Sequence, residues 1–219
     1  MPAAHPPTCR GLAPPGGGFR RRALAGPRRA LWTARVTQRT LYLISCAAPP
    51  ARHLTIPIRG AQARGWDVCL VLTPSAYRWA AEDPEGNLDE LRELTGRVVR
   101  HEYKLPSQAD AFPDPDALLV APLTSNSLNK WAAGISDTLA LGLITEGIGL
   151  GLPIVALPHW NDAQGRHPAA ARSVAELRAA GVTLLLGDGD APGFVPHKPR
   201  HGDVHAYPWE LALDALPAS

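Results

Sequence analysis

From Thr40 onward the chain repeats one pattern, in which a short apolar run is followed by a segment with helical spacing. The runs are rich in Val, Leu and Ile and carry no regular alternation of polar residues, which indicates strands buried on both faces. Strands of this kind occur in parallel sheets that are covered by helices on both sides. The pattern therefore predicts an α/β fold with a parallel sheet as the middle of three layers.

The spacing of the runs predicts a three-layer, doubly wound sheet of the Rossmann or flavodoxin-like kind. We expect six strands, at 41–48, 66–73, 97–103, 116–122, 153–158 and 182–188. We expect helices at 54–65 and 87–96, through most of 126–150, and at 167–181. In such sheets, ligands bind at the carboxyl ends of the strands, near the point where the strand order reverses.

Residues 1–39 differ in composition from the rest of the 219-residue chain. They are rich in Pro, Gly, Ala and Arg and contain no acidic residue, so we expect a disordered N-terminal extension. Residues 40–219 then form a single domain, whose hydrophobic content is sufficient for a core. Once the arginine-rich start is set aside, no basic face argues for nucleic acid.

The remaining bulk features predict a cytoplasmic protein. No apolar run approaches the ~20 residues that cross a bilayer. Cys9, Cys46 and Cys69 do not form an even disulfide framework, and the last two lie in strand-like runs. Buried, reduced thiols are therefore expected, without a metal site. The histidines at 197, 201 and 205 are spaced for a metal but lack helix formers and acidic partners.

Hydroxyl and amide side chains follow three of the predicted strands. The loops contain neither G-x-G-x-x-G nor a Walker motif, so a dinucleotide or triphosphate site is not expected. A single such residue would be explained as a helix N-cap. Several together indicate a phosphate pocket at helix N-termini, where unpaired N–H groups and the helix dipole favour an anion. The candidate cofactor-binding residues are Ser45, Thr73, Ser75, Thr124, Ser125, Asn126 and Ser127.

These loops contain no Lys or Arg, which suits the monophosphate of flavin mononucleotide (FMN) better than a triphosphate with magnesium. Asn161 follows the fifth predicted strand, and its carboxamide can donate to a substrate carboxylate or accept from a ligand. An Asx turn that redirects the chain explains Asn161 equally well.

Two motifs resemble those of the FMN-dependent cysteine decarboxylases, the flavoproteins that include phosphopantothenoylcysteine decarboxylase and the peptidyl-cysteine decarboxylases. That family carries Pro-Ala-Ser-Ala-Asn-Thr after its fourth strand, and here "PLTSNS" (122–127) is followed by Lys130, Gly134-Ile135 and Asp137. It also carries Pro-x-Met-Asn and then His-Pro, where "PHWNDAQGRHP" (158–168) stands here. The resemblance covers most of residues 40–185.

The resemblance implies bound FMN, with residues 124–127 and Ser75 around its phosphate and ribityl chain and Asn161 near the substrate carboxylate. It implies a small-molecule or peptide carboxylate as substrate. It also implies a homotrimer, or a dodecamer of trimers, with the flavin at a subunit contact to which the segment 130–153 contributes. The same apolar segment is equally well explained as core.

Two departures from the family pattern bear on the reaction. The family's catalytic histidine precedes its fourth strand, where this chain has Gln108, and His101 is the nearest candidate. His159 and the basic segment 193–210 are other possible sources of a proton acceptor. That segment also lacks the cysteine of the family's substrate clamp, and a solvated surface loop explains it better than a loop that closes over an anionic substrate.

Three functions remain compatible with the sequence. The first is an oxidative decarboxylase, a carbon–carbon lyase that uses FMN as electron acceptor. The second retains FMN without decarboxylation, as an oxidoreductase or a relative of the flavin prenyltransferases. The third is a non-catalytic flavoprotein subunit that has lost the histidine. We take the catalytic candidates to be Asn161 and His101.

Overall fold

The structure, a computed structural model, describes residues 38–187 and 192–218. The predicted disordered extension lies, apart from its last two residues, outside the described residues, and so does Cys9. The described residues all belong to one compact unit, Thr37–Ser219.

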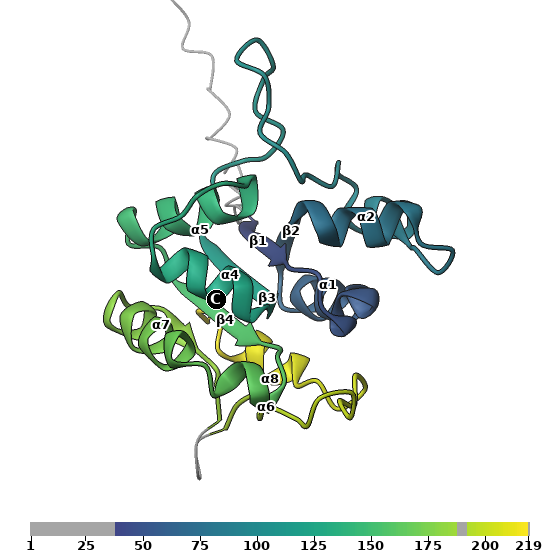
Figure 1. Cartoon of the computed structure of the whole chain (residues 1–219). Coiled ribbons are helices and arrows are strands. Elements are labelled where there is room, and N and C mark those ends of the chain that lie inside the picture. The colour runs from purple at the N-terminus through teal and green to yellow at the C-terminus, as the bar shows by residue number, and fades with distance from the viewer. Residues whose placement is uncertain (1–37, 188–191, 219) are drawn as a thin grey trace, which may run out of the picture. The chain divides into compact units, whose positions relative to one another are not determined.

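The centre of this unit is a sheet of five parallel strands (Figure 1). The strands are β1 (Arg39–Ser45), β2 (Trp66–Leu72), β3 (Ala117–Leu123), β4 (Ile154–Pro158) and β5 (Thr183–Leu184). Their order in the sheet is β2-β1-β3-β4-β5. This is the flavodoxin-like order, which confirms the predicted fold and places the reversal of strand order between β1 and β3.

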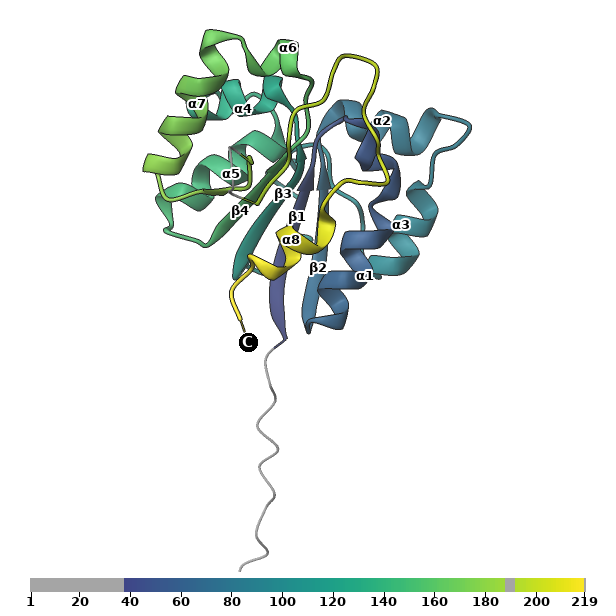
Figure 2. The same cartoon turned by 90° about the horizontal axis from the view of Figure 1, so that it is seen from below.

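Helices cover both faces of the sheet (Figure 2). The first face carries α1 (Thr55–Ala63), α3 (Leu88–Thr95) and α8 (Trp209–Asp214), and the second carries α4 (Ser125–Ala132), α5 (Leu139–Gly149) and α7 (Pro168–Ala179). Three short elements lie near the carboxyl ends of the strands: η1 (Pro49–His53), α2 (Pro74–Glu82) and α6 (Asp162–Gly165). The segment 193–208 crosses the same edge before it reaches α8 (Figure 2).

The core consists of two apolar layers, one on each face of the sheet. Along β1, Leu41 and Leu43 pack towards α1 and α8, whereas Tyr42 and Ile44 pack towards α5 and α7. This separation follows from the two-residue period of a strand, which directs successive side chains to opposite faces. Each fully buried Leu or Ile contributes about 1.5–3 kcal/mol by removal from water.

The strand predicted at 97–103 is wrong. Arg100 alone bridges to Val71, through backbone hydrogen bonds from Leu72 N to Arg100 O (2.8 Å) and from Arg100 N to Leu70 O (3.1 Å). Of the apolar pair that suggested a strand, Val99 is buried in the core, whereas Val98 is 58% exposed. Within the last predicted strand, 182–188, the described residues form only the two-residue β5, and Asp188 lies outside the described residues.

The helix predicted over 126–150 is two helices. Gly134, with φ of +72°, ends the first in the left-handed conformation that glycine adopts without strain. The Thr138 hydroxyl then accepts a hydrogen bond from Leu141 N (3.3 Å) and caps α5. The turn between them brings Asp137 back beside Lys130.

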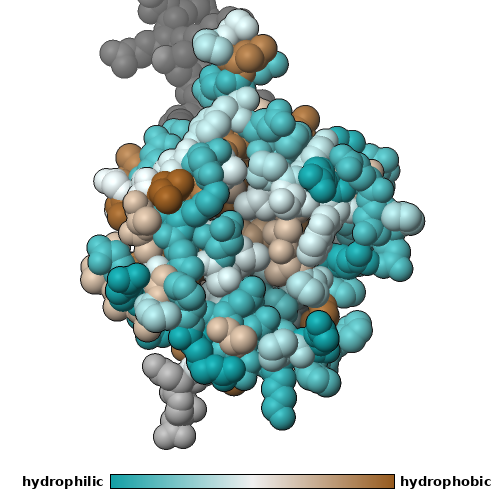
Figure 3. Space-filling view, in the orientation of Figure 1, coloured by the Kyte–Doolittle hydropathy of each residue, from teal (hydrophilic) through white to brown (hydrophobic). Residues whose placement is uncertain are grey.

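The surface in the view of Figure 1 is mostly hydrophilic, with small apolar areas (Figure 3). Of the helices in the described part of the chain, none is long and apolar enough to cross a membrane. Cys46 and Cys69 are buried and are not joined in a disulfide, as predicted.

Candidate functional site

A cavity of about 410 Å³ lies at the carboxyl ends of β1, β2 and β3, beside the point where the strand order reverses. It contains six of the seven residues predicted to bind a cofactor, which come from two separate loops. The lining residues are Cys46, Ala47, Thr73, Pro74, Ser75, Thr124, Ser125, Asn126, Ser127, Lys130, Thr138, Leu141 and Gln164. We call this the switch-point cavity.

Two helix N-termini meet at the switch-point cavity. At α4, the Thr124 hydroxyl accepts from Ser127 N (3.3 Å), and no acceptor among the described residues pairs with the N–H groups of Ser125 and Asn126. At α2, the Thr73 hydroxyl accepts from Ala76 N (3.4 Å), which leaves Ser75 N–H likewise unpaired within the described residues. Unpaired N–H groups and helix dipoles make this wall of the cavity a site for an anion.

Lys130, the one charged side chain among the residues that line the switch-point cavity, is paired with Asp137 outside the lining. Lys130 Nζ lies 2.5 Å from Asp137 Oδ2, so the lysine brings little net positive charge. The sequence predicted no cation in this pocket, because Lys130 lies within α4 and outside the loops that follow the strands. Asn126 and Lys130 are four residues apart on one helix, and this spacing places both on the same face. That spacing is the signal that could have identified Lys130.

The Cys46 thiol closes the inner end of this cavity. Burial raises its pKa above the ordinary thiol value, although hydrogen bonds with Ser127 and Thr124 act in the opposite direction. The thiol is therefore a buried, neutral group at neutral pH and not a nucleophile. Among the described residues, no group of three or more His, Cys, Asp or Glu side chains is arranged to hold a metal ion.

A second cavity of about 250 Å³ adjoins the first, and we call it the histidine cavity. The two share Ala47, Thr124, Ser125 and Gln164. The histidine cavity is otherwise lined by Ala48, Pro49, His159, Trp160, Asn161 and His197. Together the two cavities form one cleft across the carboxyl ends of β2, β1, β3 and β4.

Asn161 lies in the histidine cavity and also caps α6. Its Oδ1 accepts from Gln164 N (2.9 Å), and Gln164 Oε1 accepts from Asn161 N (3.1 Å), which is a reciprocal capping box. Asn161 therefore has a structural role, as the N-cap of α6, beside any role in binding a ligand. The Asn161 amide nitrogen has no acceptor within the described residues, so its two N–H groups remain able to donate to a ligand.

Two predicted site residues do not line the cleft. Ser45 is fully buried, because its place in β1 puts it in phase with Leu41 and Leu43, on the opposite face from Cys46. His101 follows the bridge beside β2, where its ring stacks on Tyr77 with 3.5 Å between centroids. Functional roles for these two residues remain predictions.

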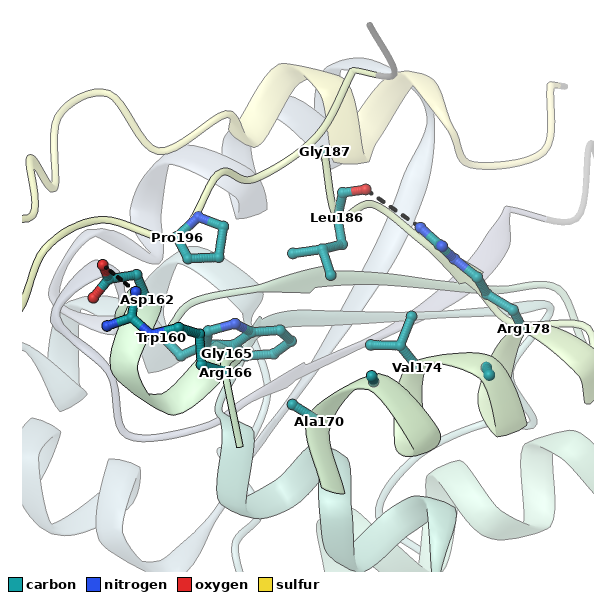
Figure 4. A pocket seen from close by; sticks show the side chains of 12 residues that line it. Trp160, Asp162, Gly165, Arg166, Ala170, Val174, Arg178, Leu186, Gly187 and Pro196 are labelled. Carbon is teal, nitrogen blue, oxygen red and sulfur yellow. Dashed lines mark hydrogen bonds and ion pairs between the residues drawn. The ribbon is translucent and has the colours of Figure 1, made fainter. Parts of the chain in front are cut away.

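A third cavity, of about 560 Å³, lies outside the cleft between α6, α7, Leu186–Gly187 and Pro196 (Figure 4). Its walls are mainly apolar, with Val174 and Leu186 facing Trp160 and Pro196. Arg178 donates to the carbonyl oxygens of Leu184 and Leu186, at 3.2 and 3.3 Å. Trp160 lines both this cavity and the histidine cavity, and thus separates them.

The fold and the cleft define a class of protein: a flavodoxin-like α/β protein with a cavity between two helix N-termini at its switch point. The chain belongs to the Flavoprotein family, whose model matches residues 58–204. The chain is also similar to phosphopantothenoylcysteine decarboxylase of Mus musculus, with 42% identity over 70 residues. That match covers 32% of this chain and 34% of the mouse protein, so the chain spans about a third of its relative.

Solved structures share the fold at lower identity. The FMN-dependent cysteine decarboxylase TvaF from thioviridamide biosynthesis matches with a TM-score of 0.56 and 22% identity, over 81% of this chain and 98% of that chain. A dodecameric FMN-dependent UbiX-like decarboxylase from Escherichia coli O157:H7 matches with a TM-score of 0.59 and 16% identity, over 80% and 92%. At these identities the likeness establishes the fold alone.

Proposed function

We propose that this protein binds FMN in the switch-point cavity and is an FMN-dependent decarboxylase that acts on a carboxylate substrate bearing a thiol. One observation carries the proposal: the N-termini of α2 and α4 direct unpaired N–H groups and hydroxyls into one cavity at the switch point. The family, and relatives named as FMN-dependent decarboxylases, support the same conclusion.

The residues present fit the phosphate of FMN. Three unpaired N–H groups and the hydroxyls around them are donors for a phosphate monoester. Because Lys130 is already neutralised by Asp137, the cavity lacks the surplus positive charge that a triphosphate with magnesium would need. The volumes of the two adjoining cavities, about 410 and 250 Å³, together suit a ligand of cofactor size.

When bound, FMN supplies the capacity to accept a hydride from the substrate. The chain's own contribution is to hold the substrate's carboxylate and to exclude water from the reacting carbon. Asn161 suits the first task, since its free amide N–H groups lie in the histidine cavity while its oxygen is engaged in capping α6. Residues 40–219 would then form the FMN-binding domain.

The first experiment tests the cofactor by binding. Purified protein, freed of any flavin, is titrated with FMN and with riboflavin, which lacks the phosphate. We expect FMN to bind at least tenfold more tightly, because charge-assisted hydrogen bonds contribute about 1.5–3 kcal/mol each. Asn126→Asp places a carboxylate at the anion site and should weaken FMN binding at least tenfold while leaving riboflavin binding unchanged.

A matched variant separates the anion site from the general charge of the helix. Asn129→Asp makes the same change on α4, but Asn129 Oδ1 accepts from Ser173 Oγ (2.8 Å) towards α7, and a carboxylate preserves that bond. FMN binding by this variant should stay within about twofold of wild type, because the new charge faces away from the site. Equal binding of FMN and riboflavin by wild-type protein would refute the phosphate site.

The second experiment tests the reaction. FMN-loaded protein is mixed without oxygen with phosphopantothenoylcysteine or with a peptide ending in cysteine. We expect the flavin absorbance to bleach and carbon dioxide to be released in equal amount. Bleaching without carbon dioxide would favour an oxidoreductase, and neither signal with either probe would favour a non-catalytic flavoprotein.

The proposed assembly is a homotrimer, or a dodecamer of trimers. Most of the apolar residues of α5 are buried in the core of the single chain, so its composition alone does not require a partner. Around it, however, Ile135 and Leu150 are 46% and 66% exposed, and Tyr103 and Leu105 are similarly exposed. Light scattering of the eluting protein gives the mass, and a monomer at micromolar concentration would overturn the assembly alone.

A further inference from the structure

The histidine cavity contains an imidazole in a position that the cofactor site does not use. His159 is the first residue after β4, and its backbone N–H donates to Leu123 O (2.9 Å) at the end of β3. This bond places His159 next to Thr124 and Ser125, which line both cavities. A ligand that spans the two cavities therefore passes the His159 side chain.

Among the described residues that line the cleft, four have side chains that can exchange a proton, and three of these are unsuitable as a base. Cys46 is a buried thiol, and Lys130 is a cation held by Asp137 at 2.5 Å. His197 Nδ1 lies 2.8 Å from Lys198 O, and since a carbonyl only accepts, the proton is on Nδ1. The remaining nitrogen, Nε2, is buried beneath Gly202, where an added Cβ would approach within 2.6 Å. His159 is left as the base open to the cleft.

The surroundings of His159 hold its ring in place and keep it neutral. Phe194, His197 and Tyr207 pack around it with ring centroids at 5.3, 5.3 and 5.7 Å. Burial, reinforced by His197, lowers the pKa of His159 to about 4, so the free imidazole is neutral and can accept a proton, and a substrate thiolate formed beside the ring would raise this pKa again. The titratable groups that face it are His197 and Tyr207, and the Tyr207 hydroxyl is engaged with Leu157 O at 2.7 Å. No carboxylate lines the histidine cavity in the described part of the chain.

We propose that His159 is the catalytic base of the cleft, accepting the thiol proton of a substrate held between the switch-point cavity and the histidine cavity. This inference rests on the proposed function. In the step, the S–H bond of the substrate breaks, its electron pair stays on sulfur, and a new N–H bond forms on the imidazole. The imidazolium returns the proton to water when the product leaves. One proton and no electrons are transferred, so this step requires no co-reactant.

The experiment compares His159→Asn with wild type, both loaded with FMN. The rate of flavin bleaching by the cysteine-ending peptide should fall about 100-fold or more at neutral pH, the usual contribution of a general base. Binding of the same peptide ending in serine, which cannot react, should stay within about threefold. The pH profile adds a readout that a structural role would not produce. The variant's rate should rise about tenfold per pH unit towards the thiol's own pKa of about 8.5, because an ionised thiol needs no base.

A magnetic-resonance measurement provides a readout that does not depend on turnover. With ¹⁵N-labelled histidine, the His159 imidazole signal is assigned by its loss in His159→Asn. Adding the serine-ending peptide should shift this signal, while the exposed His205, which lines neither cavity, should not respond. His205→Asn is the matched control for the rate and should bleach at the wild-type rate.

Each outcome separates this inference from the proposed function. If wild type and His159→Asn bleach equally at every pH, or if bound peptide leaves the His159 signal unmoved, His159 is not the base although the decarboxylase proposal stands. If His101→Asn instead shows the 100-fold loss and the alkaline recovery, the base is His101. Failure of wild type to bleach with either probe overturns the proposed function, and the inference with it.

Discussion

Two neighbouring strand-to-helix junctions in this molecule begin alike and end differently. β3 runs into α4 through Thr124, and β4 runs into α6 through Asn161, each as an extended N-cap with φ, ψ of −80°, 156° and −86°, 165°. At α4 the cap satisfies one N–H and leaves those of Ser125 and Asn126 unpaired. At α6 the capping box and the bond from Asp162 N to His197 O (2.8 Å) satisfy the N–H groups of Asp162 and Gln164, which leaves only that of Ala163 without an acceptor among the described residues.

The difference indicates what makes a helix N-terminus available to a ligand. Both junctions lie at the carboxyl edge of the sheet and both carry a favoured cap residue. At β3–α4 none of the residues 38–187 or 192–218 supplies a carbonyl to the first turn, whereas at β4–α6 the segment 193–208 does so. We therefore expect perturbations of the first junction to alter ligand affinity, and perturbations of the second to alter stability.

The largest expected effect is a loss of folding stability at acidic pH, caused by His159 at the second junction. The folded-state pKa of His159 is about 4, against an ordinary value of 6.5, so the unfolded chain binds a proton that the folded chain does not. The free energy of unfolding is therefore not reduced by this group above about pH 6.5. It falls as the pH drops from 6.5 towards 4, by up to about 3 kcal/mol. Urea unfolding at pH 7 and pH 4.5 measures it. Wild type should lose more stability than His159→Asn, and identical losses would contradict the assigned environment.

The next effect tests the first junction by deleting one backbone donor. Ser125→Pro removes an N–H at the first position of α4, where proline fits the helix and the extended Thr124 tolerates it. We expect FMN affinity to fall about 10- to 150-fold, the contribution of one hydrogen bond to a charged group. Urea unfolding without ligand should show little loss of stability.

A matched variant separates the backbone donor of residue 125 from its side chain. Ser125→Ala removes the hydroxyl and retains the N–H, so it should weaken FMN binding much less. If the two variants bind FMN equally, the backbone of α4 does not hold the phosphate.

The same substitution at the second junction should have the opposite consequence. Asp162→Pro removes the N–H that donates to His197 O, and with it an ion pair with Arg166 (3.0 Å). Asp162→Ala removes the ion pair alone. We expect the proline variant to be about 1 kcal/mol less stable than the alanine variant in urea unfolding. Their FMN affinities should be equal, and a selective loss of FMN binding in Asp162→Pro would remove the distinction between the junctions.

Local signals in the sequence were sufficient to locate most of the cleft. Hydroxyl and amide residues directly after apolar runs predicted residues 73, 75 and 124–127, and all six line the switch-point cavity. Ser45 does not line the cavity, because on β1 it lies on the same face as Leu41 and Leu43. The two-residue period of the strand, which is visible in the sequence, already implied this. The false strand at 97–103 arose because two adjacent valines resemble a buried run, although Val98 is exposed.

The histidine cavity depended on contacts that no periodicity encodes. His197 reaches His159 because Phe194 N donates to Leu185 O (2.9 Å) and Tyr207 docks by its hydroxyl on Leu157, which fixes the segment across the sheet edge. These partners are separated by 9 to 50 residues along the chain. Sequence patterns identify strands and helices through local repeats, so a chain segment that packs through single residues escapes them.

The smallest expected effect divides the two tasks of Asn161. Asn161→Asp retains the oxygen that caps α6 but replaces the N–H donors with a carboxylate, whereas Asn161→Ala loses both. Urea unfolding should show a loss of about 1 kcal/mol for alanine and almost none for aspartate, because Asp and Asn cap equally well. FMN affinity should be unchanged in both.

Binding of the serine-ending peptide then tests the carboxylate site. If Asn161 donates to the substrate's carboxylate, both variants should bind the peptide more weakly. Aspartate should be the worse of the two, because its negative charge repels the carboxylate. Weak binding by alanine alone would instead indicate that α6 affects the substrate only through its stability, which would make Asn161 a cap and not a contact.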